Sequence, residues 1–524
     1  MRLLMISIHP LTGRWQKPSM IGLYRREWNL SVPEFDLVIV GGGSAGLELA
    51  RMATRAELNV ALIEQGVSSG RHMFQRIPLM VGKIIGNSRF VDVWRSIPLT
   101  SAGGFARPIL AGRGLGGSSR INGNVAYAGP RHRYAQVYDK IGLNFSDILL
   151  ELSPGASNAA PRVHTWTDGL SELFLKATVA DGARLLDDPD DDFFGASPLH
   201  VNTRWGLRHN HLEAFYRQAK KSKLTIVQGT AKELIFTDSR VSGVVLVDGV
   251  EIHAQEIIVS AGAIGSPTLL LQSGIGDSAM LRRAGIAGKL DQPHVGRHLK
   301  DHANLRIPFS CPEHDTLNQK TRGFKALAEG FKFLTGQSDT ILRGPGASAG
   351  LNVEWENPYR IQLVHFTQDR SQVGTKGIVF EKVRGASLGM YALWPYSEGS
   401  VELTSKELRI DPGFLADQRD MTTTLQALSH ARNLIFQMGF APHSNHIDDE
   451  TLIRTGVYSG YHLIGSNRMA TTARDGVVAP DFRVHGIDGL SICDASVMPD
   501  HLSSHSYLAT IAQARMLGHQ RGWI

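Results

Sequence analysis

The strongest restriction on the fold of this chain is a glycine-rich turn between an apolar strand and a helix. Residues 35–40 read FDLVIV, a short apolar run that is typical of a buried parallel strand. Gly41, Gly43 and Gly46 follow with the spacing G-x-G-x-x-G, and helical spacing runs from Ser44 to about residue 56. We expect Gly41 to permit the tight turn and Gly43 to let the backbone approach a pyrophosphate. Gly46 would let the helix and the strand pack closely.

An acidic residue completes the pattern of a dinucleotide site. A second strand is predicted at residues 59–63 and ends in Glu64, which lies 18 residues after Gly46. A carboxylate at this place can accept hydrogen bonds from ribose hydroxyls. The backbone of Ser44 and Ala45, in the first helical turn, would face the phosphates. These residues predict a dinucleotide site rather than a plain glycine turn, but the spacing alone does not distinguish FAD from NAD.

Further strands of the same buried type lie far along the chain, at residues 256–260 and 489–494. Residues 303–455 instead mix helical stretches with alternating segments such as residues 400–404, and alternation is typical of an antiparallel sheet. We therefore predict an α/β protein, α+β overall, with a Rossmann-like domain assembled from separated segments. This domain is assigned residues 35–135, 206–302 and 456–524; a substrate domain is assigned 136–205 and 303–455, and a flexible tail 1–34.

Length and composition set the broad class. The 524 residues suit two or three domains, and the formal net charge of +6 with scattered Lys and Arg does not indicate a nucleic-acid partner. No run of about 18 apolar residues occurs, so no transmembrane segment is predicted. The apolar stretch at residues 3–8 stops at His9 without a cleavage site, which favours a cytoplasmic protein. Cys311 and Cys493 lack metal-type spacing, and we expect both to be buried small side chains, with no metal site.

Three longer segments carry a family resemblance. Residues 112–122 read GRGLGGSSRIN, residues 260–276 read SAGAIGSPTLLLQSGIG, and a third block lies between residues 461 and 496. In this order they resemble the signatures of the glucose–methanol–choline oxidoreductase family, from about residue 35 to the end of the chain. The resemblance implies FAD as the cofactor and oxidation of an alcohol by hydride transfer to the flavin.

The same resemblance identifies further cofactor contacts. Small residues of the first signature can let the flavin and pyrophosphate come close. One branch of the family attaches FAD covalently through a histidine just before the asparagine of this signature, where this chain has Ile121. Non-covalent FAD is therefore expected. By resemblance, the cofactor contacts are Gly112, Gly116, Gly117, Ser118 and Asn122, together with Asp494 and Ala495 beside the ribityl and pyrophosphate portion.

A pair of histidines is predicted to carry the chemistry. Oxidation of an alcohol requires a base for the hydroxyl proton and a group that stabilises the developing alkoxide, and histidine suits both tasks. By resemblance, His462 is the base and His505 its hydrogen-bonding partner, with roles that could be exchanged. His501 is the nearest competitor for the second position, and His302 and His485 are interpreted as structural.

Several departures from the family pattern favour an unusual small-molecule alcohol. Ser466 and Asn467 replace the more usual Thr-Cys, and residues 124–127 and 131–133 also differ from the usual segment. The sequence does not reveal the alcohol, nor whether O₂ or an organic acceptor reoxidises the flavin. A non-redox lyase of the hydroxynitrile-lyase type, which keeps FAD, is the main alternative. A flavin-bearing protein without turnover is a third, against which the intact histidine pair argues.

Overall fold

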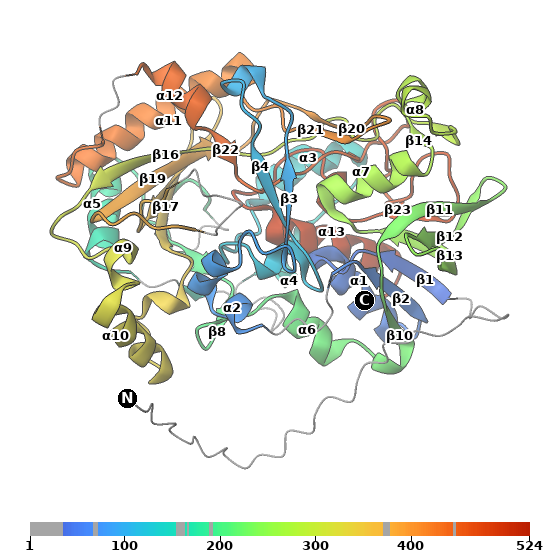
Figure 1. Ribbon diagram of the computed structural model, residues 1–524, viewed down its shortest axis with the longest axis horizontal. Coiled ribbons are helices and arrows are strands. Elements are labelled where there is room, and N and C mark those ends of the chain that lie inside the picture. Colours follow the sequence, from blue (N-terminus) through green and yellow to red (C-terminus); the bar gives the residue numbers. More distant parts are fainter. Residues whose placement is uncertain are drawn as a thin grey trace, which may run out of the picture.

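The structure is a computed structural model that describes residues 35–66, 72–153, 163–164, 167–187, 192–369, 378–443 and 447–524. The predicted tail, residues 1–34, lies outside the described residues. Two large sheets dominate the architecture and lie on opposite sides of the molecule in Figure 1, with strands β3 (Val91–Arg95) and β4 (Pro108–Gly112) between them.

The first sheet has seven strands and contains the predicted strand–helix–strand unit. β1 (Phe35–Val40) pairs in parallel with β2 (Val60–Glu64), and α1 (Ser44–Arg55) connects them. The sheet order is β10-β2-β1-β13-β12-β11, with β23 paired to β13. The remaining bounds are β10 (Leu224–Gln228), β11 (Ala231–Thr237), β12 (Arg240–Leu246), β13 (Glu251–Val259) and β23 (Leu490–Ile492).

This sheet joins parts of the chain that are distant in sequence, as predicted. β10, β2, β1, β13 and β23 run parallel, with Val40 opposite Val259 and Val259 opposite Ile492. The interior strands β1 and β2 consist almost entirely of apolar residues, as expected of parallel strands with both faces covered. α1 packs against the C-terminal helix α13 (Ser506–Gln520), whose Leu508 and Ile511 share one buried cluster with Ile39. The C-terminal segment therefore belongs to the core of the first sheet.

The second sheet is antiparallel and has six strands, in the order β22-β16-β19-β18-β17-β6. Helix α11 (Gln418–Gln437) packs on β18 and β19, and α5 (Gly169–Ala180) packs on β17 and β6. β22 lies within the segment 456–524 that was assigned to the first domain, yet it pairs with β16. The strands are β6 (Gly195–Pro198), β16 (Ala303–Ser310), β17 (Ala347–Val353), β18 (Tyr359–Val364), β19 (Gly385–Ala392) and β22 (Tyr458–Ser459).

The antiparallel sheet was predicted, but the alternating segment that suggested it lies elsewhere. β20 (Ser400–Leu403) pairs only with β21 (Leu408–Asp411), as a separate two-stranded sheet. Its Val401 packs with Ile410 and Leu299 in a small apolar cluster, which explains the alternation. The central strands β18 and β19 are buried at every residue, so they show no alternating pattern.

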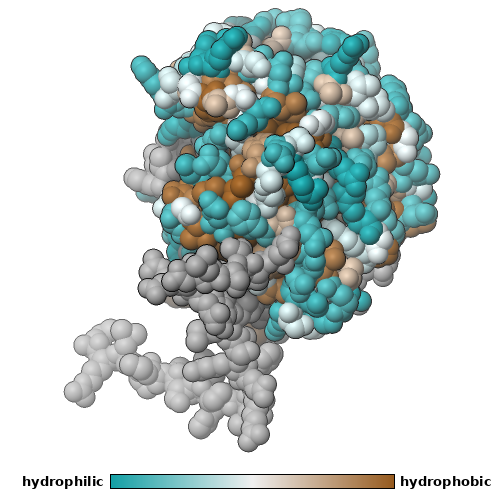
Figure 2. Space-filling model, turned by 90° about the vertical axis from the view of Figure 1, so that its right-hand side faces the viewer, coloured by the Kyte–Doolittle hydropathy of each residue, from teal (hydrophilic) through white to brown (hydrophobic). Residues whose placement is uncertain are grey.

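No helix among the described residues is long and apolar enough to cross a membrane. On the face shown in Figure 2, hydrophobic residues form small groups among hydrophilic ones. Cys311 and Cys493 are free thiols and both are buried, as predicted.

Candidate active site

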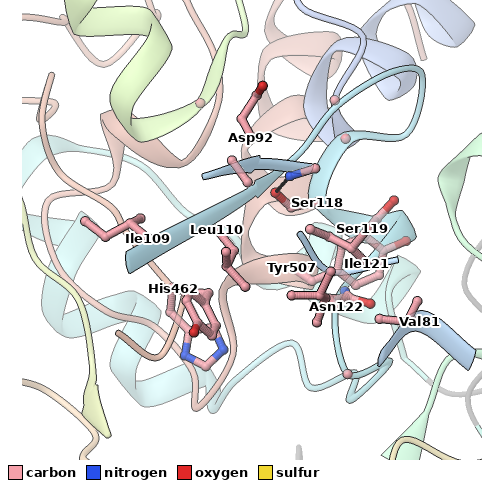
Figure 3. A pocket seen from close by; sticks show the side chains of 18 of the residues that line it. Val81, Asp92, Ile109, Leu110, Ser118, Ser119, Ile121, Asn122, His462 and Tyr507 are labelled. Atoms are coloured by element: carbon pink, nitrogen blue, oxygen red, sulfur yellow. Dashed lines mark hydrogen bonds between the residues drawn. The ribbon is translucent and has the colours of Figure 1, made fainter. Parts of the chain in front are cut away.

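A cavity of about 1290 Å³ lies between the two sheets and is lined by residues of both. This volume exceeds the roughly 300–1,000 Å³ of pockets for small ligands, so it suits a dinucleotide together with a substrate. The loops after β1, β4 and β13 form one end, and β16, β18 and β19 contribute to the other. Figure 3 shows part of this cavity, with His462, Asn122 and Ser118 around it.

The glycine-rich turn forms the cavity wall at the start of α1. Gly41 has a φ of +108°, and a Cβ there would overlap the carbonyl oxygen of Ser260. Gly43 caps α1 without a side chain, and the nearest atom to a Cβ placed on it is 3.9 Å away. A larger residue at Gly43 would therefore project into the cavity, which Gly43, Ser44 and Ala45 line. The N–H groups of a first helical turn have no intrahelical acceptor, so this wall fits a pyrophosphate.

Gly46 has the packing role expected of it and does not line the cavity. A Cβ at this position would overlap the carbonyl oxygen of Gly41, and Ile39 of β1 lies 3.3 Å away. Gly46 therefore permits the close approach of α1 to β1, which places the N-terminus of the helix at the cavity.

Glu64 lines the cavity and also fastens three loops together. Its carboxylate accepts hydrogen bonds from the backbone N–H groups of Gly42 at 2.9 Å, Gly66 at 2.7 Å and Gly114 at 3.1 Å. Among the described residues, only the Gly42 N–H reaches Oε2, which leaves that oxygen able to accept a further bond, as a ribose hydroxyl would require. The sequence pattern gave no sign of the loop-fastening role.

The first signature segment lies directly against the glycine-rich turn. Gly112, Gly117, Ser118 and Asn122 line the cavity, and a Cβ at Gly117 would come within 3.0 Å of the Cα of Gly43. The Ser118 hydroxyl accepts the N–H of Gly112 at 3.0 Å, as Figure 3 shows.

Gly116 is the member of this segment that does not line the cavity. It has a φ of +96°, and its N–H donates to the carbonyl of Gly42 at 2.7 Å. This N–H is therefore occupied within the protein, and Gly116 fixes the signature loop against the dinucleotide turn.

Asp494 and Ala495 line the cavity from the C-terminal segment. Asp494 is buried and accepts hydrogen bonds from Gly262 N at 2.8 Å, Ser266 Oγ at 2.5 Å and Ser496 N at 2.7 Å. Burial raises the pKa of Asp494, although these bonds oppose the shift. Ser266 was not singled out in the sequence, because a serine in a helix carries no signal of a partner 228 residues away.

His462 and His505 come together although they lie in different segments. Their ring centroids are 4.9 Å apart with the planes at 69°, and both line the cavity. His462 follows β22, and His505 is the N-cap residue of α13. Burial lowers the pKa of each well below the ordinary value of 6.5, so both rings are neutral at physiological pH.

A third histidine fixes the tautomer of His462. Nε2 of His302 lies 2.9 Å from the carbonyl oxygen of Leu393, which can only accept, so Nε2 carries a proton. Burial lowers the pKa of His302 to about 4, so the ring is neutral and its Nδ1 is an acceptor. Nδ1 of His462 lies 2.8 Å from this acceptor and must therefore be the donor. Nε2 of His462 consequently bears a lone pair.

His302 was interpreted as structural in the sequence, so its contact with His462 is a finding of the structure. The competitor His501 stacks on His302 with centroids 4.0 Å apart and does not line the cavity. His485 lies outside it as well, with Nε2 3.0 Å from the carbonyl of Ala470.

Asp301 supports the backbone behind His462. Its carboxylate accepts the N–H of His462 at 2.9 Å and the hydroxyl of Ser459 at 2.5 Å. Burial raises the pKa of Asp301 to about 7, although these hydrogen bonds lower it.

The unusual sequence positions mostly face away from the cavity. Ser466 donates to the carbonyl of Ala263 at 2.6 Å, and Asn467 donates to Ser496 at 3.2 Å, both in buried surroundings. Within residues 124–127, only Val125 lines the cavity. The residues that could set substrate preference must therefore be sought elsewhere in the wall.

Comparison with known proteins identifies the class. Residues 35–304 match the N-terminal model of the GMC oxidoreductase family, and residues 395–514 match its C-terminal model. The chain belongs to the GMC oxidoreductase family. Its cofactor is FAD, and the protein is an oxidoreductase for alcohol-type substrates.

Relatives with stated activities are similar over nearly the whole chain. The oxygen-dependent choline dehydrogenase of Photobacterium profundum is 27% identical over 526 residues, covering 89% of each chain. That of Pseudomonas fluorescens is 28% identical, covering 92% of this chain and 93% of its own. Among solved structures, pyridoxine 4-oxidase from Mesorbium loti has a TM-score of 0.81 at 22% identity, covering 93% of this chain and 99% of its own.

Proposed function

We propose that the protein oxidises a CH–OH carbon to a carbonyl, with His462 as the base and His505 as the hydrogen-bond donor to the substrate oxygen. The hydrogen-bond chain from Leu393 through His302 to His462 carries this proposal, since it leaves a lone pair on Nε2 of His462, whose side chain lines the cavity. FAD, when bound, supplies the two-electron acceptor for the hydride.

The residues of the first sheet fit this cofactor. The open space at Gly43 and the first turn of α1 suit the pyrophosphate, and Oε2 of Glu64 suits a ribose hydroxyl. Ile121, at the place of histidyl attachment, packs with the apolar cluster around Val81 and has no group that could form a bond. The protein therefore holds FAD without a covalent link at this position.

His462 takes the hydroxyl proton of the substrate on Nε2. The O–H bond breaks as the C–H electron pair leaves with the hydrogen as hydride, and the C=O bond forms. The imidazolium is disfavoured in this buried place, because burial lowers the pKa of His462. Its Nδ1–H remains bonded to His302, which holds the ring in one orientation throughout.

His505 stabilises the negative charge that develops on the substrate oxygen. Its Nδ1 lies 3.0 Å from the hydroxyl of Ser504. When that hydroxyl donates, Nε2 of His505 carries the proton and can donate to the oxygen. The two histidines then act on one atom from two sides.

The acceptor that regenerates oxidised FAD is either O₂ or an organic molecule. The relatives include an oxygen-dependent dehydrogenase and an oxidase, which favours O₂. Assays of the reduced holoenzyme with O₂ and with an artificial quinone acceptor distinguish the two.

Anaerobic mixing of the holoenzyme with primary, amino, sugar and aromatic alcohols tests the proposal. Bleaching of the oxidised flavin band by an alcohol supports it. His462→Ala should slow bleaching roughly 10²–10⁴-fold and His505→Ala roughly 10²–10³-fold, with FAD retained. The double variant should lose less than the product, because both groups act on one oxygen. His501→Ala is the control. Cleavage of a cyanohydrin without bleaching by any alcohol would favour the lyase alternative.

A further inference from the structure

Three polar side chains on the second sheet line the cavity without hydrogen-bond partners of their own. Asn304 and Arg306 project from β16, and Gln362 projects from β18. Oδ1 of Asn304, Nε of Arg306 and Oε1 of Gln362 are buried atoms with no hydrogen bond to any described residue. Asn304 and Gln362 are only 7% and 9% exposed. Because buried polar groups are nearly always paired, the Arg306 N–H calls for an acceptor inside the cavity, and the two amide oxygens call for donors.

A glycine creates the space between them. Arg306 and Gln362 are both directly opposite Gly389 of β19, one on each neighbouring strand. A Cβ on Gly389 would lie 3.6 Å from Arg306, from Asn304 and from Gln362, so any side chain there would fill this recess. The three polar groups thus surround a recess whose floor is the backbone of Gly389.

The recess lies beside the histidine pair. Tyr391 is two residues beyond Gly389 on the same face of β19, which is about 7 Å along a strand. The ring of Tyr391 is 6.2 Å from that of His462, and both line the cavity. A small molecule can therefore reach the recess with one end and the histidine pair with the other.

The recess carries the positive charge of Arg306, which has no counter-ion among the residues that the structure describes. The Arg306 guanidinium lies over the rings of Phe366 at 5.2 Å and Tyr458 at 5.8 Å, and it forms no ion pair with a described residue. Lys320, also at the cavity wall, already faces Asp168 at 3.6 Å. Arg322 donates to the carbonyl of Phe380 at 2.7 Å. Among Arg306, Lys320 and Arg322, Arg306 is the cation with a buried N–H that has no hydrogen bond to a described residue, and it is therefore placed to meet an anion.

We propose that the substrate is a hydroxy acid whose carboxylate binds the Arg306 guanidinium in this recess. A planar guanidinium matches a carboxylate with two parallel hydrogen bonds. Binding there places the carbinol carbon toward His462 and His505, so the inference rests on the proposed function for its reactive end. A cationic amino alcohol would instead place a positive charge beside Arg306.

A binding experiment tests the anion site without turnover. Oxidised holoenzyme is titrated with acetate, propionate, benzoate and phenylacetate, and with the corresponding neutral amides, while the flavin spectrum and the heat of binding are recorded. At least one carboxylate should bind roughly 10-fold or more tightly than its amide, and Arg306→Met should remove the preference, since charge-assisted bonds are worth about 1.5–3 kcal/mol. Lys325→Met is the control; Lys325 is an exposed cation outside the cavity lining.

A kinetic experiment then links the site to the reaction. Hydroxy acids and their methyl esters are compared as substrates by kcat/KM. Arg306→Met should lower the acid-to-ester ratio of kcat/KM about 10²-fold. Arg306→Lys should lower this ratio less, because lysine keeps the positive charge but lacks the two parallel N–H donors of the guanidinium.

The outcomes separate the two proposals. Tight carboxylate binding with no flavin reduction by any alcohol would contradict the proposed function and leave the anion site standing. Equal binding of acids and amides, or an acid-to-ester ratio that Arg306→Met does not change, would overturn the anion site. In that case alcohol oxidation by the histidine pair would still stand if alcohols bleach the flavin.

Discussion

Nδ1 of His302 and Nδ1 of His462 lie 2.8 Å apart, so one of two neutral rings must donate to the other. Because His302 already donates through Nε2 to the carbonyl of Leu393, the donor is His462. In the proposed reaction the proton-accepting atom is therefore Nε2 of His462, and its lone pair is set by a residue that lies 160 positions away in the sequence.

This relationship predicts the behaviour of His302 variants. His302→Phe preserves a ring but removes the acceptor, so the His462 proton can move to Nε2 and the base is lost. Anaerobic flavin reduction should then fall toward the roughly 10²–10⁴-fold loss expected for a missing base, with FAD content unchanged. His302→Gln, whose amide oxygen can accept and whose amide nitrogen can donate, should recover part of the rate.

His501→Phe is the matched control for these variants. His501 stacks on the same ring of His302, 4.0 Å away, and makes no hydrogen bond to His462. Its replacement should leave the rate within about threefold of the original, a change of less than 1 kcal/mol. Equal losses of the flavin-reduction rate in His302→Phe and His501→Phe would show that the packing of these rings, and not the tautomer of His462, determines the rate.

Gly43→Val should block FAD binding and leave the fold intact. The backbone at Gly43 has a φ of −71°, which a side chain tolerates, and no protein atom lies within 3.9 Å of a Cβ there. The valine would occupy the space of the pyrophosphate, so the FAD content should fall at least about tenfold. Gly288→Val is the control, since a Cβ at Gly288 meets nothing within 4 Å. Normal flavin content in Gly43→Val would mean that this turn does not hold phosphate.

The purified protein should release its flavin on denaturation. Ile121 stands at the place of histidyl attachment and packs among apolar side chains, so we expect no covalent bond there. Acid precipitation should leave FAD in the supernatant, measured by its absorbance. Flavin that stays in the pellet would refute non-covalent binding.

Asp301 should make the stability depend on pH. Burial raises its pKa to about 7 from 3.8, so the folded state keeps a proton that the unfolded state releases. The resulting stabilisation is complete below about pH 4 and is lost as the pH rises through about 7, up to about 4 kcal/mol in all. Asp301→Asn cannot titrate, and its Tm should therefore fall less than that of the original protein between about pH 5 and about pH 8.

An exposed carboxylate provides the comparison for Asp301. Asp339 is paired with Lys332 at the surface, and Asp339→Asn should leave the pH dependence of Tm close to that of the original protein. Identical Tm profiles for Asp301→Asn and the original protein would mean that Asp301 is ionised in the folded state.

Local patterns were enough to predict the dinucleotide unit. The strand, the helix, Gly41, Gly43 and Glu64 lie within 30 residues, so their spacing reports their geometry directly. His462 and His505 could be named because each lies in a segment that resembles a family signature. The hydrogen bonds of Glu64 to three loops could not be foreseen, since they depend on where distant loops pass.

The recess around Gly389 could not be predicted from the sequence, for a different reason. Asn304, Arg306 and Gln362 meet only because β16, β19 and β18 pair in one register around Gly389. That register follows from long-range strand pairing, and the central strands are buried on both faces without the alternation that would reveal them. The alternating segment at residues 400–404 pointed instead to a separate hairpin.

The most direct test of the account is the pH dependence of anaerobic flavin reduction, followed by stopped flow, in the original protein and in His462→Gln. Burial lowers the pKa of His462, so the base stays neutral as the pH falls and the rate should decline only well below about pH 6.5. His462→Gln should be slower, without this acidic decline, and deuterium on the carbinol carbon should slow reduction by the original protein. An acidic decline that persists unchanged in His462→Gln would assign the base to another group, and His505 would be the first to examine.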